Sequence, residues 1–325
     1  MVSLLIRIVL FLAIALLVLW LLLARPSWPV NGSYRPESPA PSPERLRQNV
    51  TTLAQVYYPR DQAHPQVLDR AAIFLAKGFR ETTDRVSEQT FLVNGTEYRN
   101  VVAVYGPEGD AVVVVGAHYD TDGEQPGADD NASGVAALLE LGHLLANAEL
   151  QIQVQLVAYS LEEMPHFRTE NMGSFVHAAS LKSSGRTVVL MISLEMIGYF
   201  DDTPNSQGFP WPLLKLFYPS TGNFITIVGA LFGGGQARAL KQTIDQYTEV
   251  PAFSINAPRF IPGVDFSDHL SYWEHGFPAV MVTDTAFYRN LAYHSKSDTP
   301  DRLDYQRMAQ VVYGVFRYLI TLAGR

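Results

Sequence analysis

The chain has 325 residues, of which 47% are apolar, enough for one large α/β domain or two small ones. Acidic residues outnumber basic ones by 32 to 24, and the net charge of −8 disfavours nucleic acid as the main partner, because phosphate binding needs a basic surface. The absence of cysteine excludes disulfides, thiolate catalysis and thiolate-based zinc sites.

The N-terminus carries a long apolar run. Ile8–Ala24 lies between Arg7 and Arg25 and, with the residues before it, makes about 30 Å of helix. The run ends without the small-residue pattern of a signal-peptide cleavage site. We therefore predict that residues 1–25 are an uncleaved signal anchor, which holds the protein in a membrane with an extracytoplasmic catalytic domain. A cleaved signal peptide and a buried core helix are the alternatives.

A proline-rich segment follows the apolar run. Residues 26–43 contain six prolines in eighteen positions, which predicts a stiff, extended linker leading away from the membrane. Residues 44–325 are then expected to form the catalytic domain. This region opens with helical patterns near Pro43–Tyr57 and Gln66–Lys77, followed by a pair of short strands.

From residue 111 onward, short β-branched runs alternate with helical patterns. Strands are predicted at 111–116, 154–159, 188–194, 224–228 and 279–282, and helices at 134–146, 173–181, 236–247 and 305–323. This alternation predicts an α/β fold with a mostly parallel mixed sheet covered by helices on both faces. Asp201–Thr221 and Pro251–Asp265 are predicted to be irregular and to form the rim of a site. His166 and His177 are expected at the surface.

Carboxylates and histidines gather where the predicted strands end, and function collects at such ends in open α/β sheets. No comparable set of lysines or arginines is placed to neutralise them, and buried carboxylates without counter-charge cost several kcal/mol each. Oxygen and imidazole ligands suit zinc, manganese or cobalt. Two metals that share one bridging carboxylate need five ligands, and the set provides His118, Asp130, Glu163, Glu195 and His294. Glu162 is then left over as a carboxylate beside the metals, in the position of a general base.

Six short pieces of this region resemble the co-catalytic zinc aminopeptidase superfamily, which includes bacterial leucyl aminopeptidases, glutamate carboxypeptidases and, more distantly, glutaminyl cyclases. They appear in the family's order over residues 111–301. The pieces are "GAHYD", "PGADDNASG", the "EE" of "YSLEEM", "LEMIG", "SDHLSYWEHGFPAV" and "YHSKSDTPD".

The resemblance implies a role for each residue. Asp130 would bridge two zinc ions, His118 and Glu195 would complete one site, and Glu163 and His294 the other. Glu162 would be the general base, and Asp120 would orient His118 through its second ring nitrogen. The implied reaction is hydrolysis of a peptide bond, at a free N-terminus, by a zinc-dependent metallopeptidase with a bridging water, in which cobalt or manganese can replace zinc.

Two departures from the family pattern leave alternatives open. Glu195 stands where the family usually has aspartate, and extra residues follow Glu163 and are expected to reshape the pocket rim. A single-zinc, glutaminyl-cyclase-like acyltransferase is one alternative, although that branch usually has tryptophan where Tyr293 stands. A non-catalytic membrane-bound ectodomain is another, although such proteins usually lose ligands. The sequence leaves the preferred side chain, aminopeptidase against carboxypeptidase action, and the oligomeric state open.

Overall fold

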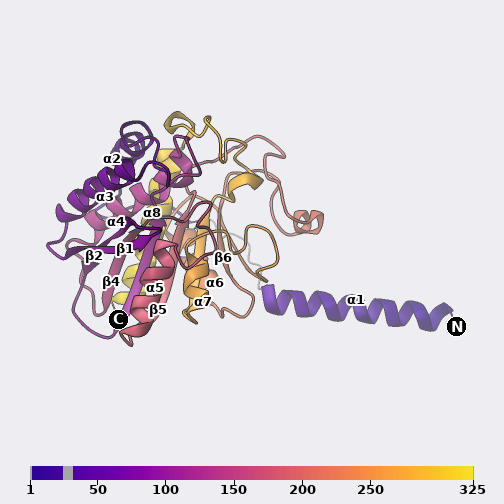
Figure 1. The fold of residues 1–325 in the computed structure, drawn as a ribbon. Helices are drawn as coiled ribbons and strands as arrows, with labels where there is room; N and C mark the ends of the chain where they lie inside the picture. The colour runs from indigo at the N-terminus through magenta and orange to yellow at the C-terminus, as the bar shows by residue number, and fades with distance from the viewer. Residues whose placement is uncertain (1, 25–31, 325) are drawn as a thin grey trace.

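In the computed structural model, which describes residues 2–24 and 32–324, the chain builds one eight-stranded sheet (Figure 1). The strand order is β1-β2-β4-β3-β5-β8-β6-β7. The strands are β1 (Val86–Val93), β2 (Thr96–Tyr105), β3 (Ala111–His118), β4 (Gln153–Tyr159), β5 (Thr187–Glu195), β6 (Ile225–Ala230), β7 (Ala252–Ala257) and β8 (Ala279–Thr283).

The middle of the sheet is parallel. β3 pairs in parallel with β4 on one side and β5 on the other, and β5 pairs in parallel with β8. β6 and β7 are parallel to each other but antiparallel to β8, and the β1–β2 hairpin adds an antiparallel edge. The predicted mostly parallel mixed sheet is confirmed. The parallel centre brings the carboxyl ends of β3, β4, β5 and β8 to one edge.

Helices cover both faces of this sheet, as β3 illustrates. Val113 and Val115 belong to the large core that also contains side chains of the first group of helices, whereas Val112 and Val114 face the second group. Successive residues of a strand point to opposite faces, so the four consecutive valines serve both cores. The first group comprises α2 (Pro43–Thr51), α3 (Pro65–Arg80), α4 (Gly134–Leu145), α6 (Gln236–Tyr247) and α8 (Tyr305–Ala323), and the second α5 (Gly173–Ser183) and α7 (His269–Glu274).

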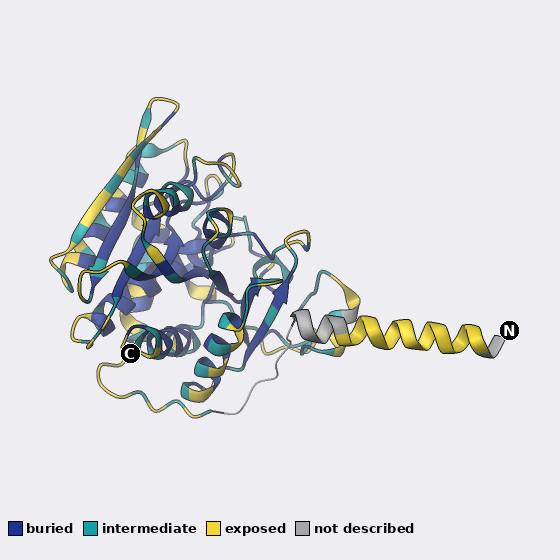
Figure 2. Cartoon of the chain, turned by 90° about the horizontal axis from the view of Figure 1, so that it is seen from below, coloured by how far each residue is buried: buried dark blue, intermediate teal, exposed yellow. Residues whose placement is uncertain are grey.

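The N-terminal run forms helix α1 (Val2–Ala24), which leads away from the sheet (Figures 1 and 2). Its described side chains, at positions 4–18, are all exposed. Among the residues that the structure describes, no helix is both long and apolar enough to cross a membrane. The predicted anchor includes positions 19–24, whose side chains lie outside the described residues, so it stays a prediction.

Part of the proline-rich segment contacts the catalytic domain. Residues 25–31 lie outside the described residues, but Tyr34 packs edge-on against Tyr313 of α8, and the backbone N–H of Glu37 donates to the Tyr313 hydroxyl at 3.2 Å. At the start of α2, Arg45 forms a bidentate pair with the buried Glu140, at 2.6 and 2.9 Å. The segment after residue 32 therefore lies against α8 and α4.

Three local expectations were wrong. The stretch predicted to be irregular at Pro251–Asp265 contains strand β7, because Phe253 and its neighbours pair in register with β6. His166 and His177 are buried rather than at the surface. His177 lies on α5, where its Nδ1 atom is 2.6 Å from the hydroxyl of Tyr272 on α7, and burial lowers the pKa of its imidazole to about 4. It is a neutral core residue.

Candidate active site

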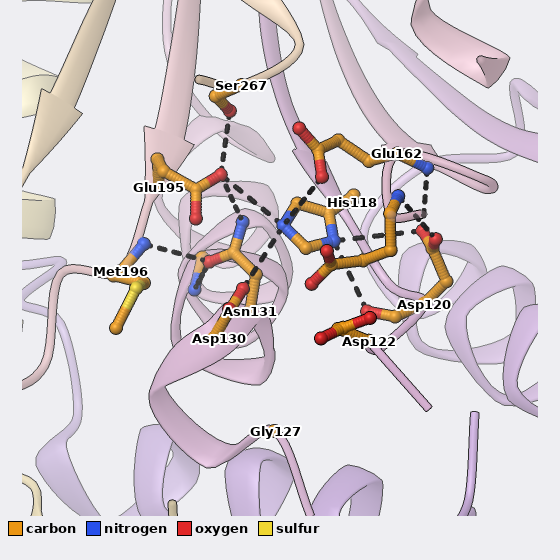
Figure 3. Close-up of polar contacts among 12 residues, drawn as sticks. His118, Asp120, Asp122, Gly127, Asp130, Asn131, Glu162, Glu195, Met196 and Ser267 are labelled. Carbon is orange, nitrogen blue, oxygen red and sulfur yellow. Dashed lines mark hydrogen bonds and ion pairs between the residues drawn. The ribbon is translucent and has the colours of Figure 1, made fainter. Parts of the chain in front are cut away.

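Four of the predicted site residues meet at one edge of the sheet. His118 is the last residue of β3, and Glu195 is the last residue of β5. Glu162 and Glu163 follow the end of β4. Because β3 lies between β4 and β5 and all three strands are parallel, their carboxyl ends bring these side chains together, as Figure 3 shows for His118, Glu162 and Glu195.

Asp130 reaches the same edge from the turn before α4. It lies in η2 (Ala128–Ser133), and its backbone N–H donates to Asp298 at 3.0 Å. The next residue, Asn131, ties this turn to β5: its Nδ2 atom donates to the carbonyl of Leu194 at 2.8 Å, and its Oδ1 atom accepts from the backbone N–H of Met196 at 3.1 Å. Contacts on both sides therefore hold Asp130 beside the strand ends.

The two oxygens of Asp130 face two different histidines. Oδ1 lies 3.4 Å from Nε2 of His118, and Oδ2 lies 3.2 Å from Nε2 of His294. His118 also lies 3.3 Å from Glu195, and His294 lies 3.4 Å from Glu163. The five predicted ligands thus form two groups of three side chains that share Asp130. His294 comes from the loop between η4 (Ala286–Tyr288) and η5 (Pro300–Arg302).

Glu162 lies beside these groups, and Glu162, His118 and Glu163 place one ligand atom each within 4.8 Å of one another. Its carboxylate is 3.9 Å from Nε2 of His118, the longest of the contacts that His118 makes with surrounding carboxylates. Burial, together with the charges of Glu163 and Glu195, holds the pKa of Glu162 well above its usual range, although His118 opposes the shift. A carboxylate with a raised pKa beside a ligand cluster has the properties of a proton acceptor and donor.

Excess negative charge dominates the electrostatics. Burial lowers the pKa of His294, but Asp130 and Glu163 outweigh burial and raise that pKa to about 11. Burial and the charge of Asp130 raise the pKa of Glu163 to about 8, against the opposing influence of both histidines. In the described part of the chain, no lysine or arginine forms an ion pair with these carboxylates. The cluster therefore favours positive charge, whether protons or a cation.

The spacing of the donor atoms fits a metal ion. Zinc binds histidine nitrogen and carboxylate oxygen at about 2.0–2.2 Å, so two donors at neighbouring corners of a tetrahedron lie about 3.3–3.6 Å apart. The donor pairs around His118 and His294 are 3.2–3.4 Å apart. His118, Asp130 and Glu195 also place one ligand atom each within 4.8 Å of the others. The residues therefore fit zinc in donor type and in spacing.

Asp120 lies near His118, but its carboxylate mainly contacts other groups. Nδ1 of His118 is 3.2 Å from the backbone carbonyl of Asp120 and 3.7 Å from its carboxylate. The two carboxylate oxygens instead accept hydrogen bonds from the backbone N–H groups of Glu162 and Glu163, at 3.1 and 3.0 Å (Figure 3). The backbone carbonyl of Asp120 is therefore the group closest to Nδ1 of His118. The carboxylate of Asp120 instead holds the backbone that carries Glu162 and Glu163.

Comparison with known proteins agrees with this arrangement. The sequence model of peptidase family M28 matches residues 100–319. The chain belongs to peptidase family M28. The uncharacterized protein YfbL of Escherichia coli is 48% identical over 286 residues, which cover 86% of this chain and 88% of the relative. Leucine aminopeptidase 1 of Ajellomyces capsulatus is 25% identical over 289 residues, which cover 83% of this chain and 68% of that enzyme.

Solved structures share the fold of this M28 metallopeptidase at low identity. BSAP, a zinc aminopeptidase from Bacillus subtilis, superposes with a TM-score of 0.70 at 13% identity, covering 89% of this chain and 96% of BSAP. The glutaminyl cyclase of Porphyromonas gingivalis superposes with a TM-score of 0.66 at 21% identity, covering 87% of this chain and 99% of the cyclase. The fold therefore serves both a zinc aminopeptidase and a glutaminyl cyclase.

An apolar cavity of about 400 Å³ adjoins the site of this M28 chain and is bordered by Glu195. It lies over one face of β6, β7 and β8, under the long loops at 201–221 and 258–266, and Leu16 of α1 also borders it. Its lining is mainly aromatic and aliphatic, and includes Phe209, Trp211, Tyr218, Phe224, Ile255, Phe260, Phe266, Met281 and Phe287. Both segments predicted to be irregular contribute lining residues.

The extra residues after Glu163 reach the edge of this cavity. Arg168 pairs with Asp265, and its guanidinium group lies 5.3 Å from the ring of Phe167 and 5.1 Å from the ring of Phe266. Since Phe266 lines the cavity, the insertion supports the cavity wall from outside.

Several residues that support the site were not identified from the sequence. Ser267 donates to Glu195 at 2.7 Å, and Asp298 accepts from the N–H groups of Asp129 and Asp130. Both belong to family-like pieces, but spacing alone does not say what they contact. Arg60 is fully buried and donates to the carbonyls of Leu53, Tyr119, Pro126 and Gly127, and no motif marks it.

Proposed function

We propose that this M28 metallopeptidase is an aminopeptidase that uses two zinc ions. The observation that carries the proposal is the shared carboxylate of Asp130, whose two oxygens face His118 and His294 in two adjoining groups of donors. Support comes from the aminopeptidase names of a relative and of a protein with this fold, the latter described as a zinc enzyme. Cobalt or manganese is expected to substitute for zinc, since the donors are oxygen and imidazole nitrogen.

Each residue then has one task. His118, Glu195 and Asp130 would hold one ion, and Glu163, His294 and Asp130 the other. Bound zinc supplies a Lewis acid for the peptide carbonyl and lowers the pKa of water. Glu162 takes the proton from the attacking water and returns it to the amine that leaves. Asp120 keeps both glutamates in place through their backbone N–H groups.

The apolar cavity favours substrates that have a bulky apolar side chain next to the scissile bond. An engineered cavity of about 150 Å³ lined by apolar residues binds benzene, so the volume of about 400 Å³ beside Glu195 accepts more than one ring. Its lining offers little to pair with a charged side chain. We therefore expect phenylalanine, tryptophan and leucine at the N-terminus to be preferred over lysine and glutamate.

The test is a substrate panel with the full-length chain. Chromogenic aminoacyl amides should be cleaved, their N-acetylated forms should not, and dialysis against a chelator should abolish turnover until zinc is restored. Elemental analysis should recover two zinc ions per chain. Cleavage of acetylated or internal bonds in preference to free N-termini would contradict aminopeptidase action.

The glutaminyl-cyclase-like alternative makes different predictions for the same panel. Cyclisation of N-terminal glutamine without amide hydrolysis, together with one zinc ion per chain, would support it and overturn our proposal. The absence of any turnover in a chain loaded with two zinc ions would favour the non-catalytic ectodomain. The presence of both complete donor groups weighs against the non-catalytic ectodomain.

We also propose that residues 8–24 anchor the protein in a membrane, with the catalytic domain extracytoplasmic. The support is the unbroken apolar run and the absence of a cleavage pattern in the sequence. The full-length protein should stay in the membrane fraction after an alkaline carbonate wash, and protease added outside the cell should reach the domain. Release of a shortened soluble chain would contradict the anchor.

A further inference from the structure

The two ring nitrogens of His294 have different surroundings. Nε2 faces the shared cluster, with Asp130 at 3.2 Å and Glu163 at 3.4 Å. Nδ1, on the other side of the ring, lies 2.8 Å from Oδ2 of Asp122. Asp122, Glu163 and His294 place one ligand atom each within 4.8 Å of one another. A short contact to Nδ1 places the proton on that nitrogen, which leaves the lone pair of Nε2 directed at the cluster.

His118 is held in another way. It ends strand β3, its side chain is 1% exposed, and its Nδ1 atom lies closest to a backbone carbonyl. His294 lies in a loop, its side chain is 27% exposed, and its backbone has a φ of 51°, which non-glycine residues seldom adopt. Its ring stacks on that of Tyr293, with centroids 3.7 Å apart. His294, the more exposed of the two histidines, thus has the closer carboxylate at Nδ1: Asp122 lies 2.8 Å away, whereas Asp120 lies 3.7 Å from Nδ1 of His118.

The loop that carries Asp122 is itself anchored. The buried guanidinium of Arg60 donates to the carbonyls of Tyr119 and Gly127, on either side of the loop. The backbone N–H of Thr121 donates to the Arg60 carbonyl at 3.1 Å, and the side chain of Gln125 donates to the carbonyl of Asp122. Asp122 therefore presents its carboxylate to His294 from an anchored loop that lies 172 positions away in the chain.

We propose that Asp122 is a positioning residue that sets the tautomer and the direction of His294, and thereby the affinity of the metal position formed by His294, Glu163 and Asp130. The inference rests on the proposed role of His294 as a ligand. Asp122 acts through the ring, because its carboxylate contacts Nδ1 while Asp130 and Glu163 face Nε2. Its charge also makes the imidazole a more basic ligand, as carboxylate partners of metal-binding histidines do.

The experiment is a zinc titration of the full-length chain after removal of metal, in competition with a chromogenic zinc indicator. Asp122→Asn keeps the shape and removes the charge, and Asp122→Leu also removes the acceptor. Glu124→Gln is the matched control, because it removes one negative charge from an exposed side chain of the same loop. Thermal unfolding in chelator reports whether each variant is folded.

Wild-type protein and Glu124→Gln should show the same two zinc affinities. Both Asp122 variants should weaken one of the two by about 10–100-fold and leave the other unchanged. Their kcat should recover when enough zinc is added to fill both positions, which separates metal affinity from catalysis.

Two results would overturn the inference while leaving the proposed function intact. One is a pair of unchanged zinc affinities in Asp122→Asn and Asp122→Leu. The other is an equal loss of both affinities together with a lower Tm in chelator, which would make Asp122 a support of the loop alone. A wild-type chain that binds no zinc would instead contradict the proposed function and, with it, the role of Asp122.

Discussion

The carboxylate of Asp120 accepts a hydrogen bond of 3.0 Å from the backbone N–H of Glu163, and thereby joins the loop after β3 to the loop after β4. Its other oxygen accepts from the N–H of Glu162 at 3.1 Å. One side chain therefore sets the position of the proposed base and of a proposed ligand. Both glutamates are also buried, so moving either residue would break hydrogen bonds that water does not replace.

Asp120→Asn should lower both the stability of the fold and the rate of the reaction. The amide offers one acceptor oxygen for two donors, and leaving one buried N–H unpaired costs about 1–3 kcal/mol. We expect the free energy of unfolding in urea to fall by that amount and kcat to fall by about 10–100-fold. If asparagine is tolerated in both measurements, the carboxylate is not what holds the glutamates.

Glu162→Gln should separate proton transfer from metal binding. Glutamine keeps the size of the side chain but accepts no proton, and a general base contributes about 10²–10⁴ in rate. The variant should keep two zinc ions and lose roughly that factor in kcat, whereas Glu163→Gln should lose zinc affinity. Near-wild-type turnover of Glu162→Gln with full metal would remove Glu162 from the mechanism, and loss of metal would mean that the two roles are reversed.

Glu195→Asp should keep two zinc ions and activity, because the carboxylate is retained at a position where the family usually has aspartate. Glu195→Ala should keep one ion only. The shorter aspartate side chain draws the carboxylate away from Ser267, which now donates to it at 2.7 Å, so Ser267→Ala on the wild-type background is the control for that lost bond. Two tightly bound zinc ions in Glu195→Ala would show that Glu195 is no ligand.

Filling the apolar cavity should change substrate preference without removing metal. Val228 and Ala257 line the cavity, and phenylalanine at either position occupies space that a substrate side chain would use. We expect kcat/KM for phenylalanyl and leucyl amides to fall by about 10–200-fold and that for alanyl amides to change little. Zinc content measured on the same samples is the control. An equal fall for all three substrates would place the side-chain pocket elsewhere.

His269→Gln should make the free energy of unfolding depend less on pH below about pH 6.5. Burial lowers the pKa of His269 to about 4, whereas an unfolded histidine titrates near 6.5. Between these two values the unfolded chain binds more protons, so the free energy of unfolding falls as pH falls, by about 3 kcal/mol for this group. Glutamine can still donate to the carbonyl of Val264, which now lies 2.9 Å from Nε2 of His269.

The comparison is best made by urea unfolding of both proteins between pH 7 and pH 4.5 in chelator, so that loss of metal does not contribute. All other titrating groups act equally on the two curves. The wild-type curve should descend more steeply below pH 6.5. Parallel curves would mean that His269 is not held neutral by burial.

The sequence by itself determined the α/β fold class and predicted the residues of the candidate site. Runs such as Val112–Val115 favour strands buried on both faces, and parallel strands align their carboxyl ends, so His118, Glu163 and Glu195 were expected at one edge. The six family-like pieces, in order, then pointed to Asp130 and His294.

Only the tertiary structure decided which side chain contacts which. Asp120 contacts Nδ1 of His118, as expected, but its carboxylate also accepts hydrogen bonds from two backbone N–H groups. The closer carboxylate–imidazole contact joins Asp122 to His294. The buried position of His177 and the apolar cavity beside Glu195 also emerged from packing. Strand periodicity is a local property of the chain, whereas loop conformations depend on contacts between segments far apart in sequence, and no local pattern encodes those contacts.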